Sequence, residues 1–208
     1  MTTTLVLGRM DVERLLSMPD CIDAVERAFL HHARGQTIAP AVVGAHVEGG
    51  GFHVKTAGLF DAIDGGPAFA AKINANFPGN RDRHGLPTIQ GVLALFDAAN
   101  GRLLALLDSG AITILRTAGA TAVAAKHLAP ERAIVAICGC GDQARAQLRA
   151  LACVRPLVRV TAIDLNAERA TRFAREMATE FGIETTVAPA PRDAARDTNV
   201  WVTCTPAR

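Results

Sequence analysis

The stretch AIVAICGCGDQA at residues 133–144 decides how the second half of the chain folds. The apolar run Ala133–Cys138 predicts a buried strand, and the residues from Asp142 onward predict a helix. Between them, Gly139 permits a tight turn and Gly141 lets another group approach the backbone. A glycine turn between a strand and a helix is typical of dinucleotide binding, because free N–H groups at the helix start attract a pyrophosphate.

Strands and helices alternate along the chain after residue 130. Strands are expected at 133–138, 157–163, 183–188 and 199–204, and helices at 142–152 and 167–181. This alternation predicts parallel βαβ units with right-handed crossovers. The alternative interpretation is an α/β domain with a glycine turn and no nucleotide.

An acid at the end of the second of these strands supports the nucleotide interpretation. Asp164 follows Gly139 by about 25 residues, close to the spacing of an acid that binds the adenosine ribose. Such an acid favours NAD, because it would repel the 2′-phosphate of NADP. Asn166 and Arg169 follow closely, so NADP stays open as an alternative. Thr205 follows the last strand, at the sheet edge where ligands lie in open α/β folds.

The first half of the chain contains a strand with two contrasting faces, AFAAKINANFPGN at residues 68–80. One face is apolar at a period of two, and we expect it to be core: Phe69, Ala71, Ile73, Ala75 and Phe77. Lys72, Asn74 and Asn76 point to the opposite face, and a Pro-Gly-Asn turn follows. Aligned polar side chains can hold a small polar ligand. The alternative is the solvated outer face of an ordinary strand.

Further segments of the first half are expected to form a mixed or antiparallel sheet. One helix precedes these strands in the sequence and another follows them. Strands are expected in short pieces over 38–58 and at 89–97 and 102–108, and helices at 9–34 and 112–128. Asn100-Gly101 is a strong hairpin signal between the last two strands.

The helix expected at 112–128 places Arg116 in its first turn. The helix dipole disfavours a cation there by roughly 0.3–1 kcal/mol. A carboxylate or phosphate bound between the helix start and the guanidinium would offset this cost, with the bidentate geometry that arginine offers. The alternative is a salt bridge to Asp108 or another acid.

Composition excludes several classes of protein. A net charge of +2 is too small to indicate nucleic acid or an anionic membrane as a partner. No apolar run approaches the roughly 20 residues that span a bilayer, and MTTT at residues 1–4 does not begin a signal sequence.

Five cysteines without a framework spacing fit a reducing compartment, so we expect a cytoplasmic protein. Cys138 and Cys140 lack a partner pair, and no metal site is predicted.

Five groups of residues form a specific combination by their order and spacing. They are Lys72-Ile73-Asn74 with Phe77-Pro78-Gly79-Asn80, Gly85-Leu86-Pro87-Thr88, Thr113-Ile114-Leu115-Arg116-Thr117, Ala124-Ala125-Lys126-His127-Leu128-Ala129, and Gly139-x-Gly141-x-Gln143. In this combination the chain resembles the ornithine cyclodeaminase/mu-crystallin family. The resemblance implies an α/β fold with an N-terminal α+β substrate-binding and dimerisation domain, residues 1–130. An incomplete Rossmann-type parallel sheet that binds NAD(P), residues 131–208, then follows.

The resemblance also implies roles for individual residues. Lys72 is expected at the substrate carboxylate and the reacting α-carbon, and Arg116 between that carboxylate and the cofactor, both as catalytic residues. The expected cofactor-binding residues are Thr88, Arg116, Thr117, Gly139, Gly141, Asp142, Gln143, Asp164 and Thr205.

The function that the resemblance implies is NAD(P)-dependent hydride chemistry at the α-carbon of a small amino or imino acid. A cyclic ketimine (pyrroline-2-carboxylate type) reductase or an amino-acid dehydrogenase is favoured. The alternatives are an ornithine cyclodeaminase, a non-catalytic NADPH-binding protein similar to mu-crystallin, and an inactive remnant, so enzymatic activity stays open. The expected cofactor is NAD, with NADP as the alternative, and the expected assembly is a homodimer through the sheet of the first domain.

Two departures from the family pattern bear on these expectations. The segment Pro40–Val43 lacks the arginine that often binds the substrate carboxylate in family members. Carboxylate binding is therefore expected to be weaker or differently built, with His53 or Lys55 as candidate substitutes. Lys55 is also the rival catalytic lysine, although it lacks the Asn and Pro-Gly-Asn context of Lys72. The chain stops before the later Rossmann strands and the loop with the family's catalytic aspartate, so a truncated product or a fragment is expected.

Overall fold

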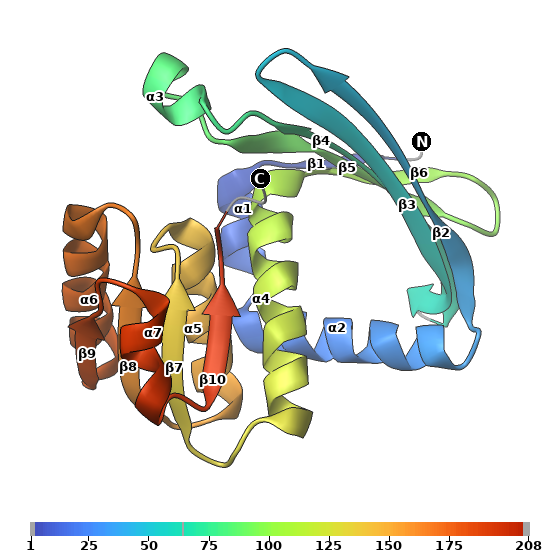
Figure 1. Cartoon of the computed structure of the whole chain (residues 1–208). Coiled ribbons are helices and arrows are strands. Elements are labelled where there is room, and N and C mark those ends of the chain that lie inside the picture. The colour runs from blue at the N-terminus through green and yellow to red at the C-terminus, as the bar shows by residue number, and fades with distance from the viewer. Residues whose placement is uncertain (1–2, 64, 206–208) are drawn as a thin grey trace. The chain divides into compact units, whose positions relative to one another are not determined.

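The computed structural model describes residues 3–63 and 65–205, which divide into two packing units (Figure 1). The first unit comprises Met1–Ser17 and Glu26–Thr113, and the second comprises Met18–Val25 and Ile114–Arg208. Two helices contribute to both units: α2 (Met18–Ala33) and α4 (Ser109–Leu128). The functional boundary expected between residues 130 and 131 stays a prediction.

The first unit is built on a six-stranded mixed sheet with the order β1-β6-β5-β4-β3-β2. Its elements are β1 (Leu5–Leu7), α1 (Arg9–Leu15), β2 (Thr37–Val47), β3 (Gly50–Ile63), β4 (Gly66–Asn76), α3 (Asn80–His84), β5 (Ile89–Asp97) and β6 (Leu103–Asp108). β1 runs parallel to β6, and the other neighbours are antiparallel. The sheet expected from the sequence is confirmed, and so is the hairpin at Gly101, whose φ of 77° only glycine adopts readily.

Three local expectations for the first half were wrong. Residues 9–34 form two helices, because the chain is extended at Leu16, where α1 ends. The pieces expected over 38–58 are two long strands, paired with one irregularity between Ile38 and Ala41. The turn after Phe77 continues into the short helix α3, which Gly85 ends in the left-handed conformation.

The apolar face of β4 is not the core that the sequence predicts. A row of aliphatic side chains crosses four strands in direct register: Val43, Val54, Ile73 and Val92. Val43 is 69% exposed, Ile73 is 46% exposed and Val92 is 37% exposed. Of the residues of β4, only Ala68 is buried. This face of the sheet therefore presents apolar side chains to its surroundings.

The second unit holds a parallel sheet with the order β10-β7-β8-β9, as the alternation of strands and helices predicts. Its elements after α4 are β7 (Ala133–Cys138), α5 (Asp142–Val154), β8 (Leu157–Ile163), α6 (Ala167–Phe181), β9 (Glu184–Val187), α7 (Pro191–Ala194), a 3₁₀ turn (Ala195–Asp197) and β10 (Val200–Thr203). α7 and the 3₁₀ turn were not expected. Ile137, Leu148 and Phe173 are fully buried in the core of this unit.

Helix α4 packs through small side chains within the second unit. Ala118 and Ala122 are fully buried and cluster with Ile22 of α2 and Ala150 of α5. The guanidinium of Arg155 donates to the carbonyls of Lys126, Ala129 and Val154. Carbonyls at the C-terminus of α4 are thereby satisfied.

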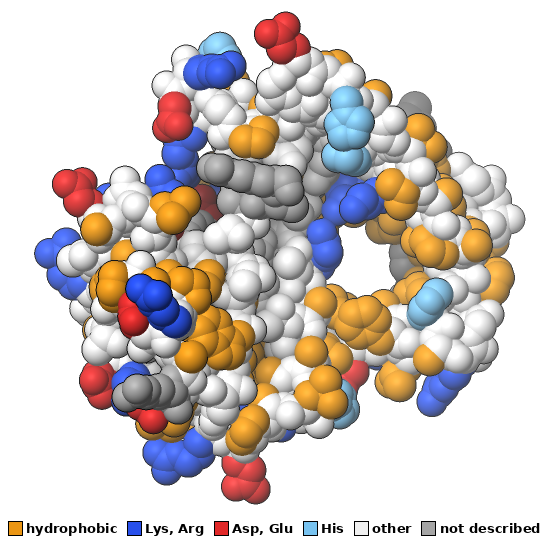
Figure 2. All heavy atoms as spheres, in the orientation of Figure 1, with side chains coloured by type: hydrophobic (Ala, Val, Ile, Leu, Met, Phe, Trp, Pro, Cys, Tyr) orange, Lys and Arg blue, Asp and Glu red, His pale blue; other side chains and the backbone are white. Residues whose placement is uncertain are grey.

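The surface of the second unit carries an apolar area at one edge of its sheet. Figure 2 shows hydrophobic side chains over β10 and α7, and Trp201 of β10 is 43% exposed. Trp201 is the single tryptophan of the chain, which contains no tyrosine, so its fluorescence reports on this unit alone. No described helix is long and apolar enough to cross a membrane.

Candidate functional site

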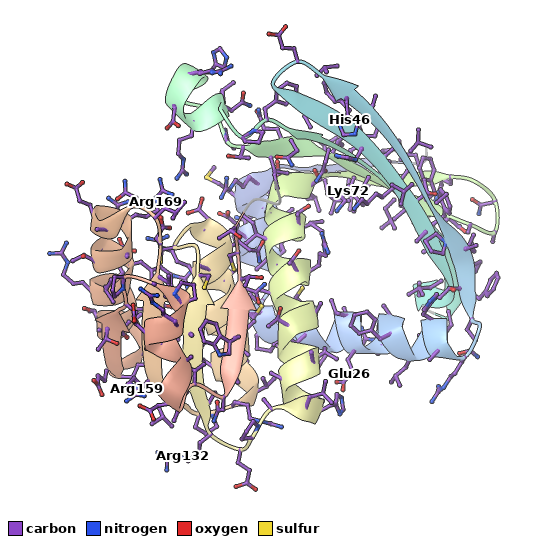
Figure 3. All side chains as sticks on the ribbon, viewed as in Figure 1. Glu26, His46, Lys72, Arg132, Arg159 and Arg169 are labelled. Carbon is purple, nitrogen blue, oxygen red and sulfur yellow. The ribbon has the colours of Figure 1, made fainter. Side chains whose placement is uncertain are left out.

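Lys72 is held by polar side chains of the first unit. Its Nζ donates to Oγ1 of Thr113 over 3.3 Å, and Nδ2 of Asn74 donates to the same oxygen over 3.3 Å. Thr113 belongs to the first turns of α4 and is buried. The alternation of β4 puts Lys72 and Asn74 on one face, as the sequence predicts. The uncharged hydroxyl of Thr113 accepts a hydrogen bond from each of them. Figure 3 shows Lys72 on the sheet of the first unit.

Ser109 and Gly91 complete this polar cluster. The hydroxyl of Ser109, which is fully buried, donates to Oδ1 of Asn74 over 2.6 Å. Gly91 lies directly opposite Asn74. A Cβ at residue 91 would come within 2.0 Å of the Ile73 carbonyl and within 2.8 Å of both Asn74 Oδ1 and Ser109 Oγ. Glycine is required at residue 91, because any side chain there would displace the hydrogen bonds that orient Asn74.

Lys55 lies directly opposite Lys72 on the neighbouring strand β3. Residues directly opposite in an antiparallel pair share a face, with Cβ atoms about 4.5–5.5 Å apart. His53 is likewise opposite Asn74, so two lysines and a histidine share this face. Like charges directly opposite one another are destabilising, and a bound anion would relieve their repulsion.

An apolar pocket of about 310 Å³ continues along the same face within the first unit. The next row of directly paired side chains after Lys55 and Lys72 is formed by Ala57, Ala70 and Leu95, and all three line the pocket. Helix α2 contributes Ala28 and His32 to the lining. The pocket could take an aliphatic group of a ligand whose charged group lies at the lysines.

Helix α4 begins earlier than the sequence predicts. Asp108 Oδ1 accepts the N–H of Ala111 over 2.8 Å, and the helix starts at Ser109 instead of residue 112. Arg116 is therefore the eighth residue of α4 and lies outside its first turn, so the dipole argument for an anion at Arg116 was wrong. Within the second unit, no described acid pairs with Arg116. Arg116 is exposed as a residue. Partial desolvation of its guanidinium lowers its pKa, and the charge of the Cys21 thiol opposes this shift.

The glycine turn of the second unit has the conformation that a dinucleotide site requires. Gly139 has a φ of 88°, and a Cβ there would lie 2.9 Å from the carbonyl oxygen of Cys204. Gly141 differs, because its φ is −92° and an added Cβ would meet no atom within 4 Å. A helix start in general leaves backbone N–H donors without intrahelical acceptors. The open space at Gly141 and these donors fit a pyrophosphate.

Asp164 connects the end of β8 to the glycine turn. Its Oδ2 accepts the N–H of Cys140 over 2.8 Å, and its Oδ1 accepts the N–H of Asn166 over 2.9 Å. Burial, reinforced by this carboxylate, raises the pKa of Cys140 to about 12. The Cys140 thiol is therefore protonated at neutral pH. No three described His, Cys, Asp or Glu side chains gather as metal ligands.

The remaining expected site residues lie in both units. In the first unit, Thr88 precedes β5, and its carbonyl accepts the N–H of Phe77 over 2.9 Å. In the second, the Gln143 side chain donates to the carbonyl of Ile114 over 3.2 Å, which ties α5 to α4. Asp142 is the first residue of α5, and Thr117 is half-buried on α4. Thr205 follows β10, with its Cγ2 3.3 Å from the position of a Cβ at Gly139.

Sequence reasoning missed three residues of the Lys72 cluster: Gly91, Ser109 and Thr113. A glycine inside an expected strand was the available signal for Gly91, since it marks a close approach of another group. Asp108 as a helix cap would have brought Ser109 into the first turn of α4. Thr113 carries no signal by itself, because its role depends on the register of β4 and β5.

A mixed sheet unit and a parallel sheet with an open glycine turn define an α/β protein of the dinucleotide-binding class. The chain belongs to the ornithine cyclodeaminase/mu-crystallin family, whose sequence pattern matches residues 2–208. The alanine dehydrogenase of Archaeoglobus fulgidus is 36% identical over 206 residues, which cover 99% of this chain and 61% of the relative.

Two solved structures share the fold. One is the Delta(1)-pyrroline-2-carboxylate reductase of Thermococcus litoralis in complex with NADH and L-proline, with 34% identity and a TM-score of 0.88 over 96% of this chain and 61% of that chain. The other is an archaeal alanine dehydrogenase dimer with bound NAD, with 35% identity and a TM-score of 0.87 over 97% of this chain and 60% of that chain. The chain thus spans about 61% of the length of the curated relative described above.

Proposed function

We propose that the protein carries out NAD-dependent hydride chemistry at the α-carbon of a small amino or imino acid, as a cyclic ketimine reductase or an amino-acid dehydrogenase. The observation that carries the proposal is the Lys72 amine, held 3.3 Å from Thr113 Oγ1 with Lys55 directly opposite. An ammonium fixed by buried polar groups is suited to bind a carboxylate in one orientation.

Arg116 is proposed as the second cation at the substrate carboxylate. Thr113, Arg116 and Thr117 follow each other in α4 at the i, i+3 and i+4 spacing that places side chains on one side of a helix. Thr113 contacts Lys72. A guanidinium binds a carboxylate through two parallel hydrogen bonds, which would complement the single amine of Lys72.

The second unit is proposed to bind the nucleotide. The turn at Gly139 and Gly141, with Asp142 and Gln143 at the helix start, would bind the pyrophosphate, and Asp164 would accept hydrogen bonds from the adenosine ribose. Thr88, Thr117 and Thr205 are proposed as further contacts to the nucleotide. When bound, NAD supplies or accepts the hydride. Lys72 would orient the α-carbon and hold or release a proton at the amino or imino nitrogen.

The structure of the first sheet supports a homodimer as the proposed assembly. The row through Val43, Val54, Ile73 and Val92, in which Val54 is half-buried and the other three are exposed, is an apolar surface of the kind that a second copy covers. The archaeal alanine dehydrogenase relative is a dimer. We also place the protein in the cytoplasm, where NAD is available and the five free thiols stay reduced.

Deuterium transfer tests the proposed chemistry. The protein is incubated with NADH deuterated at C4 and with Δ1-pyrroline-2-carboxylate, and the proline formed is analysed by mass spectrometry. We expect deuterium at the α-carbon of the proline that the unaltered protein forms. The Lys72→Met variant should form no deuterated proline. Calorimetry of NADH binding on the same sample shows whether the nucleotide site is present.

Two other outcomes would contradict the proposal. Ammonia release from L-ornithine without a net change in NADH absorbance would identify a cyclodeaminase instead. NADH binding without deuterium transfer to imino acids and without ammonia release would identify a binding protein.

A further inference from the structure

The apolar pocket of the first unit begins beside the two lysines of its sheet. Lys55 and Lys72 form the first of three rows of directly paired residues on this face. Two residues further along each strand, Ala57 and Leu95 both pair with Ala70 and form the second row. The rows are about 7 Å apart, because an antiparallel strand rises about 3.4 Å per residue. A ligand bound at the lysines therefore meets the pocket when it extends along β4.

The far end of the pocket is formed by the third row and by helix α2. Leu59 of β3 pairs directly with Ala68 of β4 and with Thr37 of β2, and all three line the pocket. Nδ1 of His32, from α2, lies 3.4 Å from Oγ1 of Thr37, within hydrogen-bond distance. The two polar side chains at this end therefore contact each other, and the rows between them and the lysines are aliphatic.

The chemistry of the lining selects for an uncharged ligand group. Among the described residues, His32 and Thr37 are the only polar side chains that line the pocket, and none of the lining residues is Asp, Glu, Lys or Arg. A terminal ammonium or a second carboxylate would lose its hydration there without a countercharge. The volume of about 310 Å³ is near the lower end of the roughly 300–1,000 Å³ of small-molecule sites. A short aliphatic chain fits this pocket.

We propose that the pocket binds the uncharged aliphatic side chain of an amino or imino acid whose carboxylate lies at Lys55 and Lys72. The identity of this ligand as a substrate rests on the function proposed above. The site takes aliphatic monocarboxylates in preference to diamino acids and dicarboxylic acids. Since a carbon–carbon bond is about 1.5 Å long, a chain of roughly six carbons spans the distance from the first row to the second. Affinity therefore increases with chain length, because each further CH₂ group leaves water.

A titration of the full chain with three carboxylates, followed by NMR of its methyl groups, tests this pocket without a nucleotide. The probes are butanoate, hexanoate and 6-aminohexanoate. We expect hexanoate to bind roughly ten- to fifteenfold more tightly than butanoate, because each of its two extra CH₂ groups contributes about fourfold when buried. 6-Aminohexanoate should bind at least about tenfold more weakly than hexanoate. The methyl signals of Ala70 and Leu95 should shift with hexanoate.

The variant Ala70→Leu locates the chain within the protein. Its larger side chain occupies the space of the ligand chain, so hexanoate should bind with about the affinity of butanoate. The matched control is Ala99→Leu, which makes the same change at an exposed turn of the first unit. This control should keep the preference for hexanoate. Thermal melting shows whether each variant is folded, and the comparison of the three probes on the unaltered protein needs no variant.

The outcomes separate the pocket from the proposed function. Equal affinities for butanoate and hexanoate, or for hexanoate and 6-aminohexanoate, overturn the pocket, and deuterium transfer to Δ1-pyrroline-2-carboxylate by the same sample then leaves the proposed function standing. A preference for hexanoate that persists in folded Ala70→Leu also overturns the pocket, because the chain would then bind elsewhere. A preference that Ala70→Leu removes, in a protein that transfers no deuterium, supports the pocket and contradicts the proposed function.

Discussion

At the scale of single residues, chemistry depends on groups whose positions are fixed by neighbours. The hydroxyl of Thr113 accepts hydrogen bonds from both Lys72 and Asn74 and so positions them. Asn74 is further oriented by Ser109, in a space that only a glycine at residue 91 leaves open. The sequence pattern placed Lys72 and Asn74 on one face because strands alternate strictly. It could not show which groups of α4 meet them, since this depends on contacts between residues far apart in the chain.

The two lysines of this face should differ in effect. We expect Lys72→Met to lower kcat/KM for the imino acid by at least about a hundredfold, the usual effect of losing a group that moves protons. Lys55→Met should raise KM roughly twofold to fivefold with kcat unchanged, because an exposed cation contributes little to binding. Steady-state kinetics measures both. Equal losses in the two variants would show that Lys55 shares the catalytic role.

The two glycines of the turn give a second contrast. Gly139→Ala should lower the free energy of unfolding by about 1–3 kcal/mol, because its positive φ strains any other residue and the Cβ meets the Cys204 carbonyl. Gly141→Ala should change the stability by less than about 0.5 kcal/mol. It should weaken NADH binding by about tenfold, since its methyl group occupies the space left for the pyrophosphate.

Urea unfolding followed by Trp201 fluorescence and calorimetric titration with NADH measure these two effects. Unchanged NADH affinity in a stably folded Gly141→Ala variant would contradict the position proposed for the pyrophosphate.

At the scale of elements, ion pairs join α5 to α6 in the second unit. Arg149 binds Glu180 through two hydrogen bonds of 2.6 and 2.9 Å, and Arg145 pairs with Glu176 one turn earlier on each helix. The bond to Arg149 lowers the pKa of Glu180 below its usual value of 4.5. Because the folded-state pKa is depressed, this pair stabilises the fold at neutral pH and loses its effect as the pH falls below that value.

The variant Glu180→Gln should therefore be less stable than the unaltered protein near pH 7, by roughly 0.2–1 kcal/mol for such an exposed pair. The difference should shrink as the pH falls below the usual range of a glutamate and vanish once the pH is below the depressed pKa of Glu180, where both side chains are neutral. Urea unfolding at several pH values measures it. Glu131→Gln, at an exposed loop position, is the control. A difference that persists at low pH would assign the effect to packing and not to charge.

Local sequence signals predicted most of the helices and strands, and the wrong expectations have both long-range and local causes. The alternation of β4 and the Asn-Gly hairpin are local features, and each is confirmed. β1 has three residues and depends on pairing with β6, which no local pattern reveals. The start of α4 depends on the Asp108 cap, which moves Arg116 out of the first turn.

At the scale of the whole molecule, the first sheet has a face that was expected to be core and remains exposed. Apolar residues at a period of two are the pattern of a buried strand face. The pattern does not indicate which part of the protein, or which partner, covers that face. The covering surface can come from the same chain or from a second copy. The exposed row through Ile73 favours a second copy.

A charge in this row should separate the copies. We expect the unaltered protein to sediment as a dimer and Ile73→Lys to sediment as a monomer, because burying an unpaired lysine at an interface costs several kcal/mol. Val187→Lys, at a side chain of the second unit that is 42% exposed, should leave the dimer intact. Analytical ultracentrifugation measures all three proteins. A dimer that persists in Ile73→Lys would place the interface elsewhere.

We propose that the substrate carboxylate is bound by Lys72 and Arg116 and the nucleotide by the glycine turn. A crystal structure of the protein with NADH and L-proline tests it most directly. We expect the proline carboxylate within hydrogen-bond distance of both Lys72 Nζ and the Arg116 guanidinium, with the pyrophosphate over Gly139 and Gly141. Proline bound away from both cations, or a nucleotide bound away from the turn, would contradict it.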